Sequence, residues 1–168
     1  MSQTKPVLIV MGVSGAGKST IGKALAARLG WGFQEGDDLH PPANIAKMSA
    51  GIPLTDADRA PWLAAVGGWI DERIAQGDGG VITCSALKAA YRQTLTEGRP
   101  AARLVYLEGS KALIAKRVAA RSDHFMPASL VDSQFADLEP PSPAERPITV
   151  SIEQPIADQV AAVVAALN

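Results

Sequence analysis

The chain has 168 residues, of which 47% are hydrophobic, and this length supports one buried core but not two ordinary domains. Its net charge is −1 and no basic cluster stands out, which argues against nucleic acid or an anionic membrane as a partner and favours small-molecule ligands. The single cysteine, Cys84, excludes an internal disulfide, and we find neither a signal peptide nor the ~18 consecutive apolar residues of a spanning helix. We therefore expect a soluble protein of the reducing cytoplasm.

The first predicted strand is the apolar run Val7–Met11, and a glycine-rich loop follows it directly. Residues 12–19 read GVSGAGKS, which matches the phosphate-loop pattern G-x-x-x-x-G-K-[ST]. Glycine lets this backbone curl so that its N–H groups face a phosphate, while Lys18 reaches the β and γ oxygens and the Ser19 hydroxyl binds Mg²⁺. The motif predicts a nucleoside triphosphate site, and a glycine-rich turn without nucleotide is the alternative. The residues expected to contact the nucleotide are Gly12, Val13, Ser14, Gly15, Ala16, Gly17, Lys18, Ser19 and Thr20.

Apolar runs rich in β-formers recur along the chain and alternate with amphipathic helical patterns. After the first strand we expect strands at residues 31–34, 80–84, 102–107 and 148–152. The expected helices span about residues 18–29, 42–49, 56–76, 87–97, 110–121, 128–138 and 155–167, with Asp56 capping the third and Ser110 the fifth. This alternation predicts a parallel sheet covered on both faces, so the fold class is α/β and residues 1–168 form a single domain.

The polar residues after the second and third strands are the candidates for chemistry, because ligands of open parallel sheets bind outside the carboxyl ends of the strands. Asp37 follows the second strand, where a carboxylate can accept the proton of the hydroxyl that attacks in phosphoryl transfer. The alternative is that Asp37 or Asp38 caps the following helix, with Asp38 the better cap. Because no Asp ends the third strand, Asp37 is also expected to share the Mg²⁺ site with Ser19.

A longer series of motifs runs through nearly the whole chain in order. It comprises Gly36-Asp37-Asp38-Leu39-His40-Pro41, Asn44, Lys47-Met48, Gly51, Pro53-Leu54, Asp56-x-Asp58-Arg59-x-Pro61-Trp62-Leu63, Cys84-Ser85-Ala86-Leu87-Lys88-x-x-Tyr91-Arg92, His124-Phe125-Met126, Leu130, Ser133-Gln134-Phe135 and Leu138-Glu139. This series resembles the signature of the gluconokinases, the small P-loop carbohydrate kinases of the thermoresistant gluconokinase type. It is far more specific than the phosphate loop alone.

The resemblance implies a three-layer P-loop kinase sandwich like that of nucleoside-monophosphate kinases, with five parallel strands in the order 2-3-1-4-5 and a lid. It also implies ATP-dependent phosphorylation of D-gluconate at its C6 hydroxyl to 6-phospho-D-gluconate, with Mg²⁺ as cofactor, and it suggests a homodimer.

A sugar acid carries a carboxylate and several hydroxyls, so its pocket needs at least one cation of fixed geometry. Arg59, Lys88 and Arg92 are the available cations. Arg59 is the first candidate, because it lies early in the helix predicted at 56–76 and faces the cleft if its apolar neighbours face the core. The alternative for each cation is a solvated surface charge. Asp37 is also expected to contact the substrate, and so is His40, which belongs to the motif series that resembles the gluconokinases.

Two arginines four residues apart, Arg117 and Arg121, end the helix predicted at 110–121 and are placed to clamp phosphates. By resemblance they belong to a lid, at about residues 117–128, that closes over ATP and brings arginines to the transferring phosphoryl group. His124 is expected either to touch the substrate or to cap the lid. The alternative for the arginines is favourable placement of cations at a helix C-terminus.

Three further observations bear on the kinase interpretation. Cys84 ends a predicted buried strand with no histidine beside it in sequence, so we expect it to pack rather than to act as a nucleophile. Ser151 stands where the gluconokinase pattern has Asp, on the adenine side in related kinases. A shikimate kinase and a nucleotide-dependent switch are the alternatives, but the glycine-rich turn of the former and the Asn-Lys-x-Asp element of the latter are absent.

Overall fold

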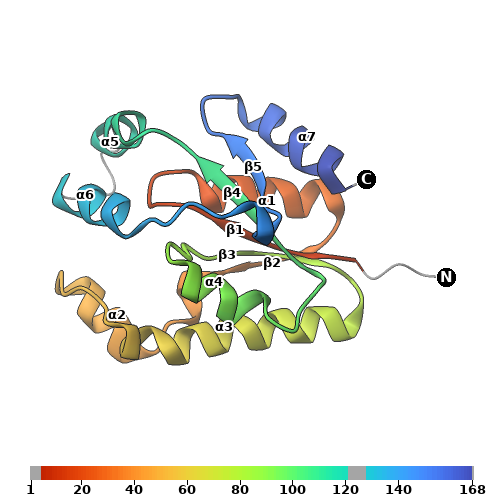
Figure 1. Cartoon of the computed structure of the whole chain (residues 1–168), viewed down its shortest axis with the longest axis horizontal. Helices are drawn as coiled ribbons and strands as arrows, with labels where there is room; N and C mark the ends of the chain where they lie inside the picture. Colours follow the sequence, from red (N-terminus) through yellow and green to blue (C-terminus); the bar gives the residue numbers. More distant parts are fainter. Residues whose placement is uncertain (1–4, 121–127, 168) are drawn as a thin grey trace.

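The computed structural model of the protein describes residues 5–120 and 128–167 (Figure 1). Arg121, His124 and most of the predicted lid lie outside the described residues. Within the described ranges, no helix has both the length and the apolar character needed to cross a membrane.

Five parallel strands form one sheet in the order β2-β3-β1-β4-β5 (Figure 1). The strands span Val7–Met11 (β1), Gly32–Glu35 (β2), Gly80–Thr83 (β3), Ala102–Glu108 (β4) and Ile148–Ser151 (β5). In the central strand, Ile9 lies opposite Ile82 of β3 on one side and Leu104 of β4 on the other. The predicted fold class and strand order are confirmed.

The helices begin and end close to the predicted residues. They span Lys18–Leu29 (α1), Pro42–Ser49 (α2), Asp56–Gln76 (α3), Ala89–Thr96 (α4), Lys111–Ala120 (α5), Ala128–Asp137 (α6) and Ile156–Leu167 (α7), with short 3₁₀ helices at Gly36–Leu39 (η1) and Pro143–Glu145 (η2). The cap predicted for α5 is confirmed, since Ser110 Oγ accepts a hydrogen bond from the N–H of Leu113 (3.1 Å).

The predicted cap of α3 is wrong by one residue. Thr55 is the N-cap and accepts a hydrogen bond from the N–H of Asp58, whose carboxylate accepts one from the N–H of Thr55 in return. Asp56 is the first residue of the helix. The reciprocal pair satisfies two N–H groups of the helix end, which a single Asp cap cannot do.

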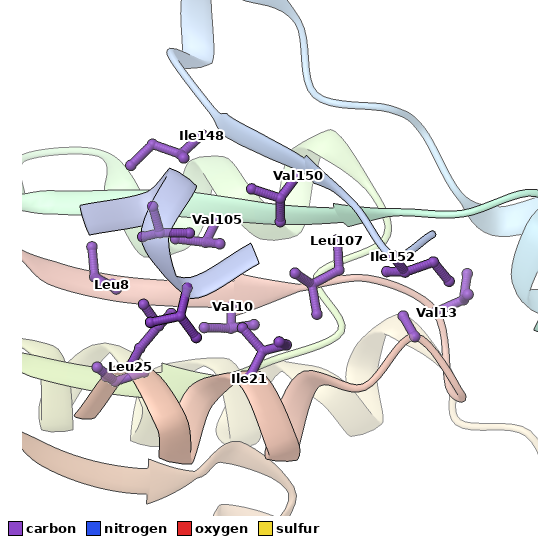
Figure 2. Close-up of a cluster of buried hydrophobic side chains, with 14 of the residues drawn as sticks. Leu8, Val10, Val13, Ile21, Leu25, Val105, Leu107, Ile148, Val150 and Ile152 are labelled. Atoms are coloured by element: carbon purple, nitrogen blue, oxygen red, sulfur yellow. The ribbon is translucent and has the colours of Figure 1, made fainter. Parts of the chain in front are cut away.

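The two faces of the sheet bury separate hydrophobic clusters, as expected for a strand buried on both sides. In β1, Leu8 and Val10 point into a cluster with α1, α5 and α7 (Figure 2). Val7, Ile9 and Met11 belong to a second cluster with α3 and the buried part of α4. All five side chains are fully buried, and each contributes roughly 1.5–3 kcal/mol to folding.

The turn after β2 begins at Gly36, where no side chain fits. A methyl group on Gly36 would lie 1.8 Å from the carbonyl oxygen of Thr83 at the end of β3. The N–H of Gly36 donates to Thr83 Oγ1 (3.1 Å), and its carbonyl accepts a hydrogen bond from Trp62 Nε1 (2.8 Å). These contacts place the next residue, Asp37, at the carboxyl edge of the sheet.

The Gly36→Ala substitution tests this close approach. The new methyl group forces β2 and β3 apart, so the free energy of unfolding should fall by about 3 kcal/mol, as for a strongly overpacked core. Urea denaturation followed by circular dichroism measures the change. Gly68→Ala is the matched control, because Gly68 lies in α3 with open space around it and should gain up to about 1 kcal/mol from helix propensity. Equal stability of the two variants would contradict the packing described.

Candidate active site

A cavity of about 360 Å³ lies beside the carboxyl ends of β1, β2 and β3. The phosphate loop contributes Ser14 and Lys18 to its wall, η1 and the following turn contribute Asp37 and His40, and α3 contributes Arg59. Apolar groups complete the lining, among them Met48, Leu54, Trp62 and Leu87. The structure therefore brings together, in one cavity, the predicted phosphate-binding lysine, the predicted base and the first candidate for carboxylate binding.

The phosphate loop has the curled backbone that its sequence predicts. Gly15 and Gly17 adopt φ of +90° and +96°, a conformation that side chains rarely tolerate. Lys18 Nζ donates to the carbonyl oxygens of Gly12 (2.9 Å) and Val13 (3.0 Å). Burial lowers the pKa of the Lys18 ammonium, while the charges of the carboxylates near it act in the opposite direction. The loop and Lys18 together form a cationic cradle at the N-terminus of α1.

Glu35, the last residue of β2, is a site residue that the sequence interpretation missed. Ser19 Oγ lies 2.8 and 2.7 Å from its two carboxylate oxygens, and Thr83 Oγ1 donates to it at 2.5 Å. Its position two residues before Asp37, at the end of a strand, is the only sequence signal that points to it. Ser19 and Glu35 form an oxygen-donor set that fits Mg²⁺, which prefers hard oxygen ligands and retains several waters.

Asp37 lies in η1, with a side chain that is 76% exposed, and it lines the cavity together with Lys18. The alternative role as a helix cap is contradicted for both Asp37 and Asp38. Helix α2 begins after Pro41 at its N-cap, and no side chain makes a capping hydrogen bond there. The carboxylate of Asp37 is therefore available to a ligand in the cavity.

His40 is buried beside Asp37 and stacks on the indole of Trp62, with ring centroids 4.2 Å apart. Asn44 Nδ2 lies 3.1 Å from His40 Nδ1, and an amide nitrogen can only donate, so the imidazole accepts there and holds its proton on Nε2. Burial lowers the pKa of His40, with Arg59 adding to the shift and Asp37 opposing it, so the ring is neutral near pH 7. His40 thus offers the cavity one N–H donor.

Arg59 is held in the cavity wall by Tyr91 of α4. Its Nη1 donates to Tyr91 Oη (3.0 Å), and the tyrosine hydroxyl in turn donates to the carboxylate of Asp56. The guanidinium also lies over the Tyr91 ring, 5.4 Å from its centroid. Lys88 lies over the same ring at 5.8 Å but is not part of the cavity lining. Tyr91 therefore orients Arg59 and leaves other guanidinium N–H groups for a ligand.

Arg92 is placed elsewhere than we predicted. It is fully buried, pairs with Glu145 (2.7 Å), and donates to the carbonyl oxygens of Ala86 (2.9 Å) and Leu87 (3.1 Å). Ala86 adopts a φ of +45°, which is uncommon for a residue with a side chain. Arg92 thus holds the loop after β3 in an unusual conformation, and its guanidinium does not line the cavity.

Of the predicted lid arginines, the structure describes only Arg117. Its Nη2 donates to the carbonyl oxygen of Ile152, just after β5, at 2.6 Å, and it does not line the cavity. In that same segment, Ser151 Oγ accepts a hydrogen bond from the N–H of Glu153 (3.2 Å). Arg117 is therefore tied to the segment that we expected on the adenine side.

Cys84 packs in the core, as predicted. It is 1% exposed, and burial is the main cause that raises the pKa of its thiol to about 12. A thiol of this pKa is not a nucleophile at neutral pH.

A search against protein families matches residues 7–141 to a model described as an AAA domain. Among solved structures, a gluconokinase from Sinorhizobium meliloti 1021 is 47% identical, with a TM-score of 0.87 over 99% of this chain and 93% of that chain. A shikimate kinase from Bacteroides thetaiotaomicron is 16% identical with a TM-score of 0.67 over 96% of this chain and 98% of that chain, and it shares the fold alone. Fold and site together define a P-loop kinase.

Curated relatives identify the family of P-loop kinases to which the chain belongs. The gluconokinase of Gluconobacter oxydans is 54% identical over 147 residues, which cover 88% of this chain and 83% of the relative. The thermosensitive gluconokinase of Escherichia coli is 44% identical over 151 residues, 89% of this chain and 81% of the relative. The chain belongs to the gluconokinase family, which confirms the resemblance drawn from the motifs.

Replacing Arg92 tests whether it serves the fold. Arg92→Met removes the guanidinium from the buried carbonyl of Ala86 and leaves the Glu145 carboxylate without its cation, so the free energy of unfolding should fall by about 3–5 kcal/mol. Urea denaturation measures the loss. The control is Arg28→Met, an exposed arginine of α1 for which at most about 1 kcal/mol is expected. A change below 1 kcal/mol for Arg92→Met would show that its buried contacts do not stabilise the protein.

Proposed function

We propose that the protein transfers the γ-phosphoryl group of ATP to the C6 hydroxyl of D-gluconate, giving 6-phospho-D-gluconate and ADP. The observation that carries the proposal is that Lys18, Asp37 and Arg59 line one cavity. One cation for the phosphates, one carboxylate for the hydroxyl proton and one arginine for a substrate carboxylate are what transfer to a sugar acid requires. The names of the relatives support the choice of gluconate.

The phosphate loop holds the donor. Its backbone N–H groups and Lys18 neutralise the β- and γ-phosphates, and the positive end of α1 adds to the same field. Lys18 Nζ, now on two loop carbonyls, can move to the phosphate oxygens, which are stronger acceptors because they are charged. We further predict that the lid arginines Arg117 and Arg121 stabilise the negative charge that develops on the phosphoryl group during its transfer.

Mg²⁺ would be held by Ser19, with Glu35 accepting from the hydroxyl and bound waters, while Asp37 shares the site from η1. When bound, the ion neutralises charge on the β- and γ-phosphate oxygens. Among the described residues no cluster of three acidic, histidine or cysteine side chains could bind a metal. This agrees with an ion that is bound through one or two protein groups, water and substrate phosphates.

Asp37 acts on the acceptor. Its carboxylate accepts a hydrogen bond from the C6 hydroxyl, orients the oxygen towards the γ-phosphorus, and takes the proton as the O–P bond forms and the bond to ADP breaks. The Nε2–H of His40 donates to a hydroxyl of the same substrate. Because the ring is neutral, it adds no positive charge that would compete with Arg59 for the carboxylate.

Arg59 binds the carboxylate of the sugar acid through its planar guanidinium, which Tyr91 holds in place. Lys88, close to the same tyrosine ring, adds positive charge at the rim. His124 stays a predicted substrate contact. A neutral polyol offers no carboxylate to the guanidinium N–H groups that Tyr91 and Asp56 leave available, and this missing ion pair is the proposed basis for rejecting neutral analogues.

The protein is further proposed to be cytoplasmic and to form a homodimer, with neither nucleic acid nor membrane as a partner. The single, buried cysteine is compatible with a reducing compartment. The dimer rests on the resemblance to gluconokinases alone, and analytical ultracentrifugation tests it.

The acceptor dependence of ADP release tests the proposed function. Purified protein with MgATP should release ADP with D-gluconate, and at the background rate with D-glucose, D-glucitol, shikimate or no acceptor. D-glucitol is the sharpest comparison, because it keeps the hydroxyls and lacks the carboxylate that Arg59 is proposed to bind. Equal release in every sample, or none with gluconate, would contradict the proposal.

The role of Asp37 is tested by Asp37→Asn, which keeps the shape and removes the basic carboxylate. We expect kcat to fall roughly 10²–10⁴-fold while ATP affinity changes little, because a positioned base acts on the chemical step. Steady-state kinetics and nucleotide binding measure the two quantities. Asp38→Asn is the control, since the neighbouring carboxylate is exposed and outside the cavity lining. A nearly fully active Asp37→Asn enzyme would rule out Asp37 as the base.

A further inference from the structure

The side chain of Gln134, in helix α6, forms hydrogen bonds with the phosphate loop. Its Oε1 accepts a hydrogen bond from the backbone N–H of Ser14 (2.6 Å), and its Nε2 donates to Ser14 Oγ (2.8 Å). Both residues line the cavity together with Lys18 and Asp37. A contact between segments 120 residues apart therefore lies where the phosphoryl donor and its acceptor meet.

A carboxamide is the group that satisfies both halves of this contact. The backbone N–H of Ser14 can only donate, so it selects the oxygen of Gln134 and turns the amide nitrogen towards the hydroxyl. Two bonds from one planar group fix both the position and the rotation of Ser14. The next residue, Gly15, has a φ of +90°, one of the positive φ values that curl the loop. Gln134 thus fixes the residue directly before this glycine.

Helix α6 is itself anchored along its buried face and just beyond its C-terminal end. Val131 is buried, and Phe135 packs against the same hydrophobic cluster. Beyond the helix, the N–H of Glu139 donates to the carbonyl oxygen of Leu87 (2.7 Å), and its carboxylate accepts from the N–H of Ala89 (2.6 Å). Because Leu87 lines the cavity, α6 contacts two loops of the cavity lining, the phosphate loop and the loop after β3.

We propose that Gln134 is a positioning residue for phosphoryl transfer, which holds the phosphate loop at Ser14 in register with the acceptor pocket. In-line transfer needs the reacting atoms about 3–3.5 Å apart, and a misplacement of about 1 Å can lower the rate roughly 10²-fold. Gln134 acts through Ser14 and bears no charge, so its loss affects the alignment of bound substrates more than their affinity. The inference rests on the proposed function.

Three variants test the inference in a double-mutant cycle. Gln134→Met keeps the length of the side chain and removes both hydrogen bonds, and kcat should fall about 10–100-fold with less than about threefold change in either KM. Ser14→Ala removes one of the two bonds and should lower kcat less. In the double variant, the loss should match that of Gln134→Met within about twofold, because the residues act as one unit. Gln93→Met, an exposed glutamine of α4, is the matched control and should behave as wild type.

The measurements separate the possible outcomes. Turnover of the wild-type enzyme with D-gluconate is measured first, and its absence would overturn the proposed function. If the wild type is active, unchanged kcat in Gln134→Met, or losses that simply multiply in the double variant, would overturn the positioning role alone. A fall in melting temperature together with weaker ATP binding would assign Gln134 to folding and likewise overturn it. Reduced kcat with retained melting temperature and ATP affinity supports the inference.

Discussion

The site depends on one constraint, the junction of three elements at Thr83. The hydroxyl of Thr83 accepts a hydrogen bond from the N–H of Gly36 and donates to Glu35, whose carboxylate in turn contacts Ser19 at the start of α1. The end of β2, the end of β3 and the start of α1 are thereby held together by polar groups in addition to apolar packing. Hydrogen bonds have directions, so this junction defines orientations that a purely apolar contact would leave loose.

The loop after β3, which also lines the cavity, is held by a buried charge. Arg92 brings Glu145 from the segment before β5 to the loop after β3 and satisfies two of its carbonyls. A buried ion pair is expensive to desolvate, and hydrophobic replacements often match its stability. Its contribution here is geometric, because a planar guanidinium with several donors holds Ala86 in the left-handed region and keeps Leu87 at the cavity.

Much of this molecule could be predicted from local patterns. The phosphate loop and the ends of α2 and α3 follow from a motif and from apolar periodicity among neighbouring residues, whereas the strand order was implied by the resemblance to the gluconokinases. The burial of Arg92 and its pairing with Glu145 could not be predicted, because Glu145 is 53 residues away in sequence and no residue near Arg92 indicates that it is buried. Glu35 carried a weak signal as the last residue of a strand. Gln134 was visible only as part of a family motif, and its contact with Ser14 required the folded chain.

The burial of Cys84 determines how its thiol responds to oxidants. Its thiol lies one residue beyond Thr83, beside the cavity-lining Ser85, and has a pKa of about 12. Burial disfavours the thiolate, which is the form that reacts with peroxides and disulfides, and it also keeps such reagents from the sulfur. The sole sulfhydryl group of the protein is therefore shielded from oxidants, although it lies next to a loop that a substrate must reach.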